Sequence, residues 1–208
     1  MNSVIVNENR ETFVSGKYDV IVAGGSLGGV RAAISAAAEG KTVLLVEETD
    51  WIGGQLTSQA VPPDEHRWIE SQGATASYLE YRRKVRDYYR NKENFSDETK
   101  KKECFCPGDS WVSRIAHEPA VAHELLSEEV GLYVRKGLIT LKLSGKVCGA
   151  ETAGDFVKNV SVMNLFDKTV KKYAAKFFLD ATDCGELLPL TGTEYREGAE
   201  SREETGEP

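Results

Sequence analysis

The sequence predicts an α/β protein of three layers, with a parallel sheet and a β-meander. Residues 18–54 carry two short apolar runs that flank an alanine-rich segment, the order of a strand–helix–strand unit. Residues 148–175 carry three further runs of strand composition, separated by short turn signals. The first pattern is typical of parallel strands joined by a crossover helix, and the second is typical of a meander.

The strand–helix–strand unit is predicted from its composition. Tyr18 to Ala23 is apolar, with three β-branched residues, and stops at glycine, as a buried parallel strand does. Val30 to Glu39 is rich in alanine, which suits a helix packed closely on a sheet, and Gly40 ends it. Thr42 to Val46 is the second strand.

The turn after the first strand predicts a diphosphate site. It reads Gly24-Gly25-Ser26-Leu27-Gly28-Gly29. At such a corner the free N–H groups of the helix point outward at the positive end of the helix dipole. Gly24 permits the tight turn and Gly29 lets the helix lie close to the strand. Ser26 stands where the G-x-G-x-x-G pattern has glycine; its hydroxyl is able to donate to a phosphate, and Gly25 and Gly28 are expected to give the backbone room.

An acidic residue completes the nucleotide pattern. Glu47 follows the second strand, 23 residues after Gly24. At about that separation a carboxylate accepts hydrogen bonds from ribose hydroxyls, and it favours an unphosphorylated adenosine ribose. Strand, helix and acid together favour a dinucleotide-binding, Rossmann-like unit over a merely flexible glycine turn.

The residues after Glu47 carry a family resemblance. Gly53 and Gly54 follow six residues later, a spacing that resembles the FAD-dependent oxidoreductases of the glutathione-reductase-like superfamily, where the Gly-Gly pair lets backbone approach the flavin. Residues 47–70, 111–119 and 179–204 look like one bacterial branch of these enzymes. The resemblance covers essentially the whole chain. It implies a three-layer FAD/NAD(P)-binding Rossmann-like domain with FAD as the cofactor; an NAD-binding Rossmann domain is the alternative.

The resemblance also implies a set of cofactor-binding residues. The ADP half of FAD is expected at the glycine turn and Glu47, and the isoalloxazine beyond residues 53–58. The predicted set is Gly24, Gly25, Ser26, Leu27, Gly28, Gly29, Glu47, Glu48, Gly53, Gly54, Gln55, Leu56, Thr57, Val147, Ala181, Thr182 and Asp183. No catalytic residue is assigned, because the flavin carries hydride transfer itself. His66 is the candidate acid–base residue, but the favoured interpretation is an ordinary histidine on a surface loop. Cys184 is a lone thiol, and a lone thiol cannot carry out dithiol exchange.

Composition limits the partners. The chain has 208 residues, 40% of them hydrophobic and 28% charged, and a net charge of −7, which argues against nucleic acid. No apolar run approaches the roughly 20 residues that span a bilayer, and no secretory signal is seen, so a cytoplasmic protein without membrane contact is expected. The four cysteines are interpreted as reduced thiols; a metal site built from Cys104, Cys106, His117 and His123 is the disfavoured alternative, and no metal is predicted.

We expect a polar lead-in with an edge strand at 3–6, one FAD-binding domain and a polar tail. The predicted segments are 1–16, 17–190 with a helical insertion at about 56–117, and 191–208. Helices are expected at 74–89 and 118–130, strands at 138–143, 148–153, 156–165, 170–175 and 177–179, and a charge-rich loop at 91–103. The arginines of the first helix are predicted to form a solvated face.

The family resemblance implies a longer protein, so the tail is interpreted as the truncated start of a missing remainder. Three functions follow. The chain is part of an FAD-dependent oxidoreductase acting on an unknown small molecule. Alternatively, it is a nucleotide-binding subunit whose active site is completed by another chain, or a fragment that folds without cofactor. A homo-oligomer or a missing carboxy-terminal region is expected as the partner.

Overall fold

A computed structural model describes residues 14–92 and 94–206, so the expected edge strand at 3–6 lies outside the described residues. Six strands form one sheet in the order β3-β2-β1-β6-β5-β4. The strands are β1 (Gly16–Ala23), β2 (Val43–Val46), β3 (Ile139–Lys142), β4 (Gly145–Ala153), β5 (Phe156–Asn164) and β6 (Val170–Asp180). β1 pairs in parallel with β2 and β6, and β2 with β3. The predicted adjacency of the first two strands is confirmed.

Helical elements connect β1 to β2, form most of the region between β2 and β3, and follow β6. They are α1 (Leu27–Ala38), the 3₁₀ turn η1 (Gly54–Leu56), α2 (Ala76–Arg90), α3 (Asp97–Lys100), α4 (Pro119–Arg135), α5 (Leu187–Thr191) and α6 (Arg202–Thr205). Helices near 74–89 and 118–130 were predicted and are confirmed, whereas the loop expected at 91–103 contains α3. No helix among the described residues is long and apolar enough to cross a membrane.

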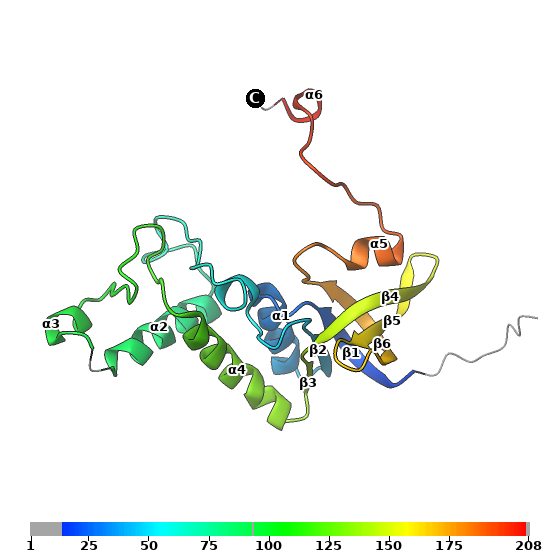
Figure 1. Cartoon of the computed structure of the whole chain (residues 1–208), viewed down its shortest axis with the longest axis horizontal. Coiled ribbons are helices and arrows are strands. Elements are labelled where there is room, and N and C mark those ends of the chain that lie inside the picture. The colour runs from blue at the N-terminus through cyan, green and yellow to red at the C-terminus, as the bar shows by residue number, and fades with distance from the viewer. Residues whose placement is uncertain (1–13, 93, 207–208) are drawn as a thin grey trace, which may run out of the picture.

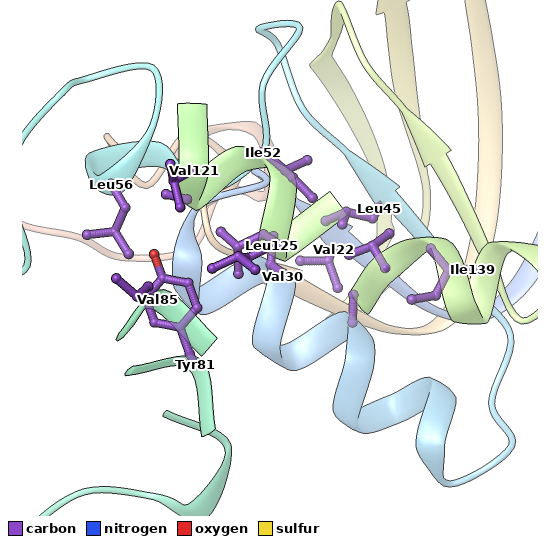
Figure 2. Close-up of a cluster of buried hydrophobic side chains, with 14 of the residues drawn as sticks. Val22, Val30, Leu45, Ile52, Leu56, Tyr81, Val85, Val121, Leu125 and Ile139 are labelled. Atoms are coloured by element: carbon purple, nitrogen blue, oxygen red, sulfur yellow. The ribbon is translucent and has the colours of Figure 1, made fainter. Parts of the chain in front are cut away.

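One face of the parallel strands packs on helices. Val22 of β1 and Leu45 of β2 are fully buried against Val30 of α1 and Leu125 of α4, as Figure 2 shows. α1 turns buried alanines toward the sheet, and their small side chains let the helix axis approach the strands closely. This close packing brings the amino end of α1 next to the strand ends.

The other face packs on the meander. Ile21, Leu44 and Val46 share a buried cluster with Val160 and Val162 of β5. In Figure 1, α1 and α4 lie on one side of β1 and β2, and β4 and β5 lie on the other. Helices, parallel strands and meander are therefore the three layers that the sequence predicted.

The last two expected strands are one strand. Residues 170–174 of β6 pair antiparallel with β5, and β6 continues in parallel beside β1 as far as Asp180. The separation expected at Lys176 was wrong because this side chain points into solvent, 74% exposed, and pairs with Asp19. A charged residue on the solvent face does not interrupt a strand. β6 thus links the meander to the parallel sheet and delivers its end to the site.

The prediction that the arginines of α2 form a solvated face was also partly wrong. Arg82 is 2% exposed and bonds the carboxylates of Glu65 and Glu70, at 2.8 Å each for the shortest contacts. Arg86 is also buried and bonds Glu70 and the Phe105 carbonyl. Buried guanidinium groups need such paired carboxylates, which lie in the loop before the helix.

Beyond α5 the chain leaves the sheet and runs out to α6 (Figure 1). Residues 193–206 are exposed throughout. This segment contributes no side chain to the pocket described next.

Candidate functional site

A pocket opens where β1, β2 and β6 end. It is lined by residues from the turn after each of these strands, together with residues of η1 and β4. The predicted site residues in its lining are Gly24, Ser26, Glu47, Glu48, Gly54, Val147, Ala181, Thr182 and Asp183. The carboxyl ends of parallel strands are where open α/β sheets bind ligands. The fold therefore brings together residues that are far apart in the sequence.

The glycine turn is fixed by two positions that admit no side chain. Gly24 has φ +93°, and a Cβ there would lie 2.2 Å from the Ala181 carbonyl oxygen. A Cβ on Gly29 would lie 2.1 Å from the Gly24 carbonyl oxygen. Both expected roles, tight turn and close helix approach, are seen. The turn is held against the end of β6, where the Ala181 N–H donates to Ala23 at 2.7 Å.

The first turn of α1 presents an unshielded amino end. Ser26 is its N-cap, and its Oγ accepts from the Gly29 N–H at 3.2 Å. The Gly28 N–H has no acceptor among the described residues, since first-turn donors lack intrahelical partners. A Cβ on Gly28 would meet only Ser26 Oγ, at 3.8 Å. Open space, a free donor and the positive helix end together fit a diphosphate.

Gly25 has a different role from the expected one. It was predicted to make room for the diphosphate, but a Cβ there would lie 2.9 Å from both Cβ and Oε2 of Glu47. Its N–H donates to Glu47 Oε2 at 2.7 Å. The missing side chain therefore makes room for the acidic residue, and the turn and β2 are locked together.

Glu47 is the most constrained acidic group of the pocket. The residue is 8% exposed, and its other carboxylate oxygen accepts from the backbone N–H and the hydroxyl of Thr49, both at 2.8 Å. A carboxylate offers about four acceptor positions, and three of them are used. Room remains for about one further donor, such as one ribose hydroxyl; the ribose contact itself stays a prediction.

The Gly53-Gly54 pair is shaped by packing. Gly53 has φ +115° and Gly54 φ +53°. A Cβ on Gly53 would lie 2.6 Å from Thr57 Cγ2, and one on Gly54 would lie 3.1 Å from Ser26 Cα. The Gly53 N–H donates to the Gly25 carbonyl at 2.7 Å. The pair is thereby pressed against the glycine turn, and only Gly54 borders the pocket.

Several predicted site residues lie behind or beside the pocket. Leu56, the last residue of η1, and the following Thr57 are buried, and Gln55 is exposed. Those absent from the pocket lining are Gly25, Leu27, Gly28, Gly29, Gly53, Gln55, Leu56 and Thr57. Their positions support the walls of the pocket; a cofactor-binding role for them stays a prediction.

Asp180 organises the turn after β6 and was missed from the sequence. It accepts from the Thr182 N–H at 3.0 Å, from the Thr182 hydroxyl at 2.6 Å and from the Leu187 N–H at 2.8 Å. Thr182 Oγ1 in turn accepts from the Glu186 N–H at 2.8 Å. The Asp-x-Thr pattern after a strand is the available signal, because aspartate bonds backbone two residues on.

Lys146 of β4 is a second missed residue. Its ammonium lies 2.6 Å from Glu186 Oε1 and 3.0 Å from Glu48 Oε2, and all three residues line the pocket. The hydrogen bond to Glu186, and then that to Glu48, raise the pKa of Lys146 above its usual value. No local pattern links these residues, because the meander brings β4 to the strand ends.

The two weighed catalytic candidates lie in different places. Cys184 is exposed and lines the pocket. His66 lies outside the lining, exposed on the loop after η1, where its Nδ1 accepts from the Trp68 N–H at 3.2 Å. A catalytic role for either residue has no further support.

The residues of the disfavoured metal site have other contacts. Across residues 14–92 and 94–206, no three His, Cys, Asp or Glu side chains gather as a metal site. His117 bonds the Tyr81 hydroxyl through Nε2 at 2.7 Å and the Ile115 carbonyl through Nδ1 at 2.5 Å. His123 stacks on Trp51 with ring centroids 4.9 Å apart. Burial lowers the pKa of His117, so a neutral ring that donates from Nδ1 fits both contacts.

Known proteins share this architecture. The chain is 34% identical over 65 residues to the FAD-dependent monooxygenase ntnJ of a Nectria species, covering 31% of this chain and 16% of ntnJ. Among solved structures, Mycobacterium smegmatis Sdh1 in complex with UQ1 is similar with a TM-score of 0.54, at 12% identity and over 79% of this chain and 33% of that one. The apo form of the Mycobacterium smegmatis Sdh1 complex is similar with a TM-score of 0.53, at 10% identity and over 81% of this chain and 34% of that one. The chain thus spans at most about a third of the length of these relatives, and the structural likeness concerns the fold.

A family comparison covers more of the sequence. Residues 19–208 match the family described as FAD dependent oxidoreductase. The match includes the glycine turn, Glu47 and the turn after β6. FAD is the cofactor of that family. This chain therefore belongs to the FAD dependent oxidoreductases.

Proposed function

We propose that this chain is the FAD-binding part of a flavin-dependent oxidoreductase and that it holds the ADP half of FAD in the pocket at the ends of β1, β2 and β6. One observation carries the proposal. Gly24, Ser26, Glu47 and Thr182, from three separate turns, border one pocket beside the amino end of α1. That arrangement offers a diphosphate a helix dipole and a ribose a buried carboxylate.

Each group has a distinct task in this proposal. The first turn of α1 would face the diphosphate, with the Gly28 N–H and the Ser26 hydroxyl as donors. Glu47 would accept one ribose hydroxyl while its bonds to Gly25 and Thr49 keep it in place. The bound flavin would supply hydride acceptance. The protein would supply position and electrostatics.

The assembly of the whole enzyme is part of the proposal. The relatives are longer than this chain, and we infer that a second copy or a further carboxy-terminal region completes the flavin site. We propose a small organic molecule as the substrate, and the net charge of −7 argues against nucleic acid as a partner. We place the protein in the cytoplasm.

A binding comparison tests the proposal against its alternatives. The chain is titrated with FAD and with NAD⁺ by calorimetry, and the desalted FAD sample is scanned for flavin absorbance. FAD should bind, remain after desalting and bind more weakly to Glu47→Gln. Tight NAD⁺ binding without retained flavin would favour an NAD domain, and binding of neither would favour a fragment or subunit without cofactor.

A further inference from the structure

The pocket has an unusual charge balance for a site that takes an anion. Its lining includes the carboxylates of Glu47, Glu48, Asp183 and Glu186. Lys146 supplies the single cationic side chain among the described residues of that lining. The diphosphate of a dinucleotide carries about two negative charges, and like charges at short range disfavour binding. Something must offset the acids.

Lys146 is placed to do so. Its ammonium lies between Glu186 and Glu48, at 2.6 and 3.0 Å, and the three side chains are 39%, 31% and 49% exposed. Ion pairs this exposed contribute little to folding stability, about 0–1 kcal/mol. Stability alone therefore gives little reason for three charges at the pocket.

Other surface lysines pair outside the pocket. Lys176 bonds Asp19 in the middle of β1, and Lys172 bonds Glu151 on β4. They repeat the chemistry of the Lys146 pairs without bordering the cofactor site. Position, and not the ion pair as such, distinguishes Lys146.

Resting on the function proposed above, we propose that Lys146 determines the pocket's affinity for diphosphates: its ammonium offsets Glu48 and Glu186 so that the acidic pocket admits a dinucleotide. Lys146 acts on the anionic part of the ligand. Adenosine alone carries no phosphate, so its binding should not depend on Lys146.

Variants and ligands of different charge test this role. Lys146→Met removes the charge and keeps the stem, Lys146→Arg keeps the charge, and Lys176→Met is the matched control. FAD, ADP and adenosine are titrated against each, with thermal unfolding of each variant without ligand. Lys146→Met should weaken FAD and ADP by about tenfold and leave adenosine within about twofold. Lys146→Arg should stay within about threefold of wild type, and Lys176→Met should match wild type.

The outcomes separate the two proposals. Wild-type chain that binds no FAD contradicts the proposed function, and ADP binding then still reports on Lys146. Unchanged ADP affinity in Lys146→Met, or an equal loss for adenosine, overturns the role of its charge. If Lys146→Met does not fold, Glu186→Gln is measured instead. It should tighten ADP by a few fold, about two- to fivefold, and a weaker ADP complex would overturn the proposal.

Discussion

Replacing Glu47 with alanine should weaken both the fold and cofactor binding. The carboxylate accepts three hydrogen bonds, one from the Gly25 N–H at 2.7 Å and two from Thr49 at 2.8 Å. Gly25 is buried, so its donor would be left without a partner, whereas Thr49 is partly exposed and regains water. An unsatisfied buried donor costs about 1–3 kcal/mol. We expect Glu47→Ala to lower the free energy of unfolding without FAD by that amount.

Urea unfolding of the FAD-free protein measures the effect, with Glu48→Ala as the control. The Glu48 side chain is 49% exposed and, within the described part of the chain, pairs only with Lys146, so its loss should change the free energy of unfolding by less than about 0.5–1 kcal/mol. With FAD added, wild type should gain stability as ligand binding requires, and Glu47→Ala should gain less. Equal unfolding midpoints for Glu47→Ala and wild type without FAD would refute the assigned bonds.

Three further predictions concern the turn and the insertion. Gly28→Ala should raise the free energy of unfolding by about 0.4–1 kcal/mol because its Cβ meets open space, whereas Gly29→Ala should lower it by about 1–3 kcal/mol through a backbone clash, both read from urea curves. Arg82→Met should cost about 3–5 kcal/mol in the same assay because it leaves the carboxylate of Glu65, 2% exposed, without its cation; a loss under about 1 kcal/mol would contradict this. Hydrogen bonds from Arg82 lower the pKa of Glu70 from 4.5 to about 2. Its stabilisation is therefore complete above pH 4.5 and is lost as pH falls toward 2, so Glu70→Gln should flatten the acid limb of stability against pH, and an unchanged slope would count against the pairing.

The nucleotide unit was predictable because its signals are local. The strand at Tyr18–Ala23, the glycine turn and Glu47 each follow from composition and short spacing, and β1, α1 and β2 formed as expected. The role of Gly25 could not be predicted from spacing. Its missing side chain makes room for Glu47, and no sequence pattern indicates this contact.

The rest depended on contacts between distant segments. Arg82 is buried because the carboxylates of Glu65 and Glu70 compensate its charge. The prediction that its side chain faces solvent rested on its charge alone and was therefore wrong. Lys146 reaches the pocket only because the meander folds across the parallel strands. Asp180 carried a readable turn signal, but its bond to Leu187 required the tertiary structure.

Hydrogen exchange with and without FAD tests the central claim most directly. FAD is added to the whole chain, and backbone amide exchange is followed by mass spectrometry, with ADP as a second ligand. We predict slower exchange in residues 24–29, 47–54 and 181–186 with FAD, and in the same three segments with ADP, because these turns border the pocket. Protection confined to the insertion at 56–117, or none in the glycine turn while FAD is bound, would contradict the account.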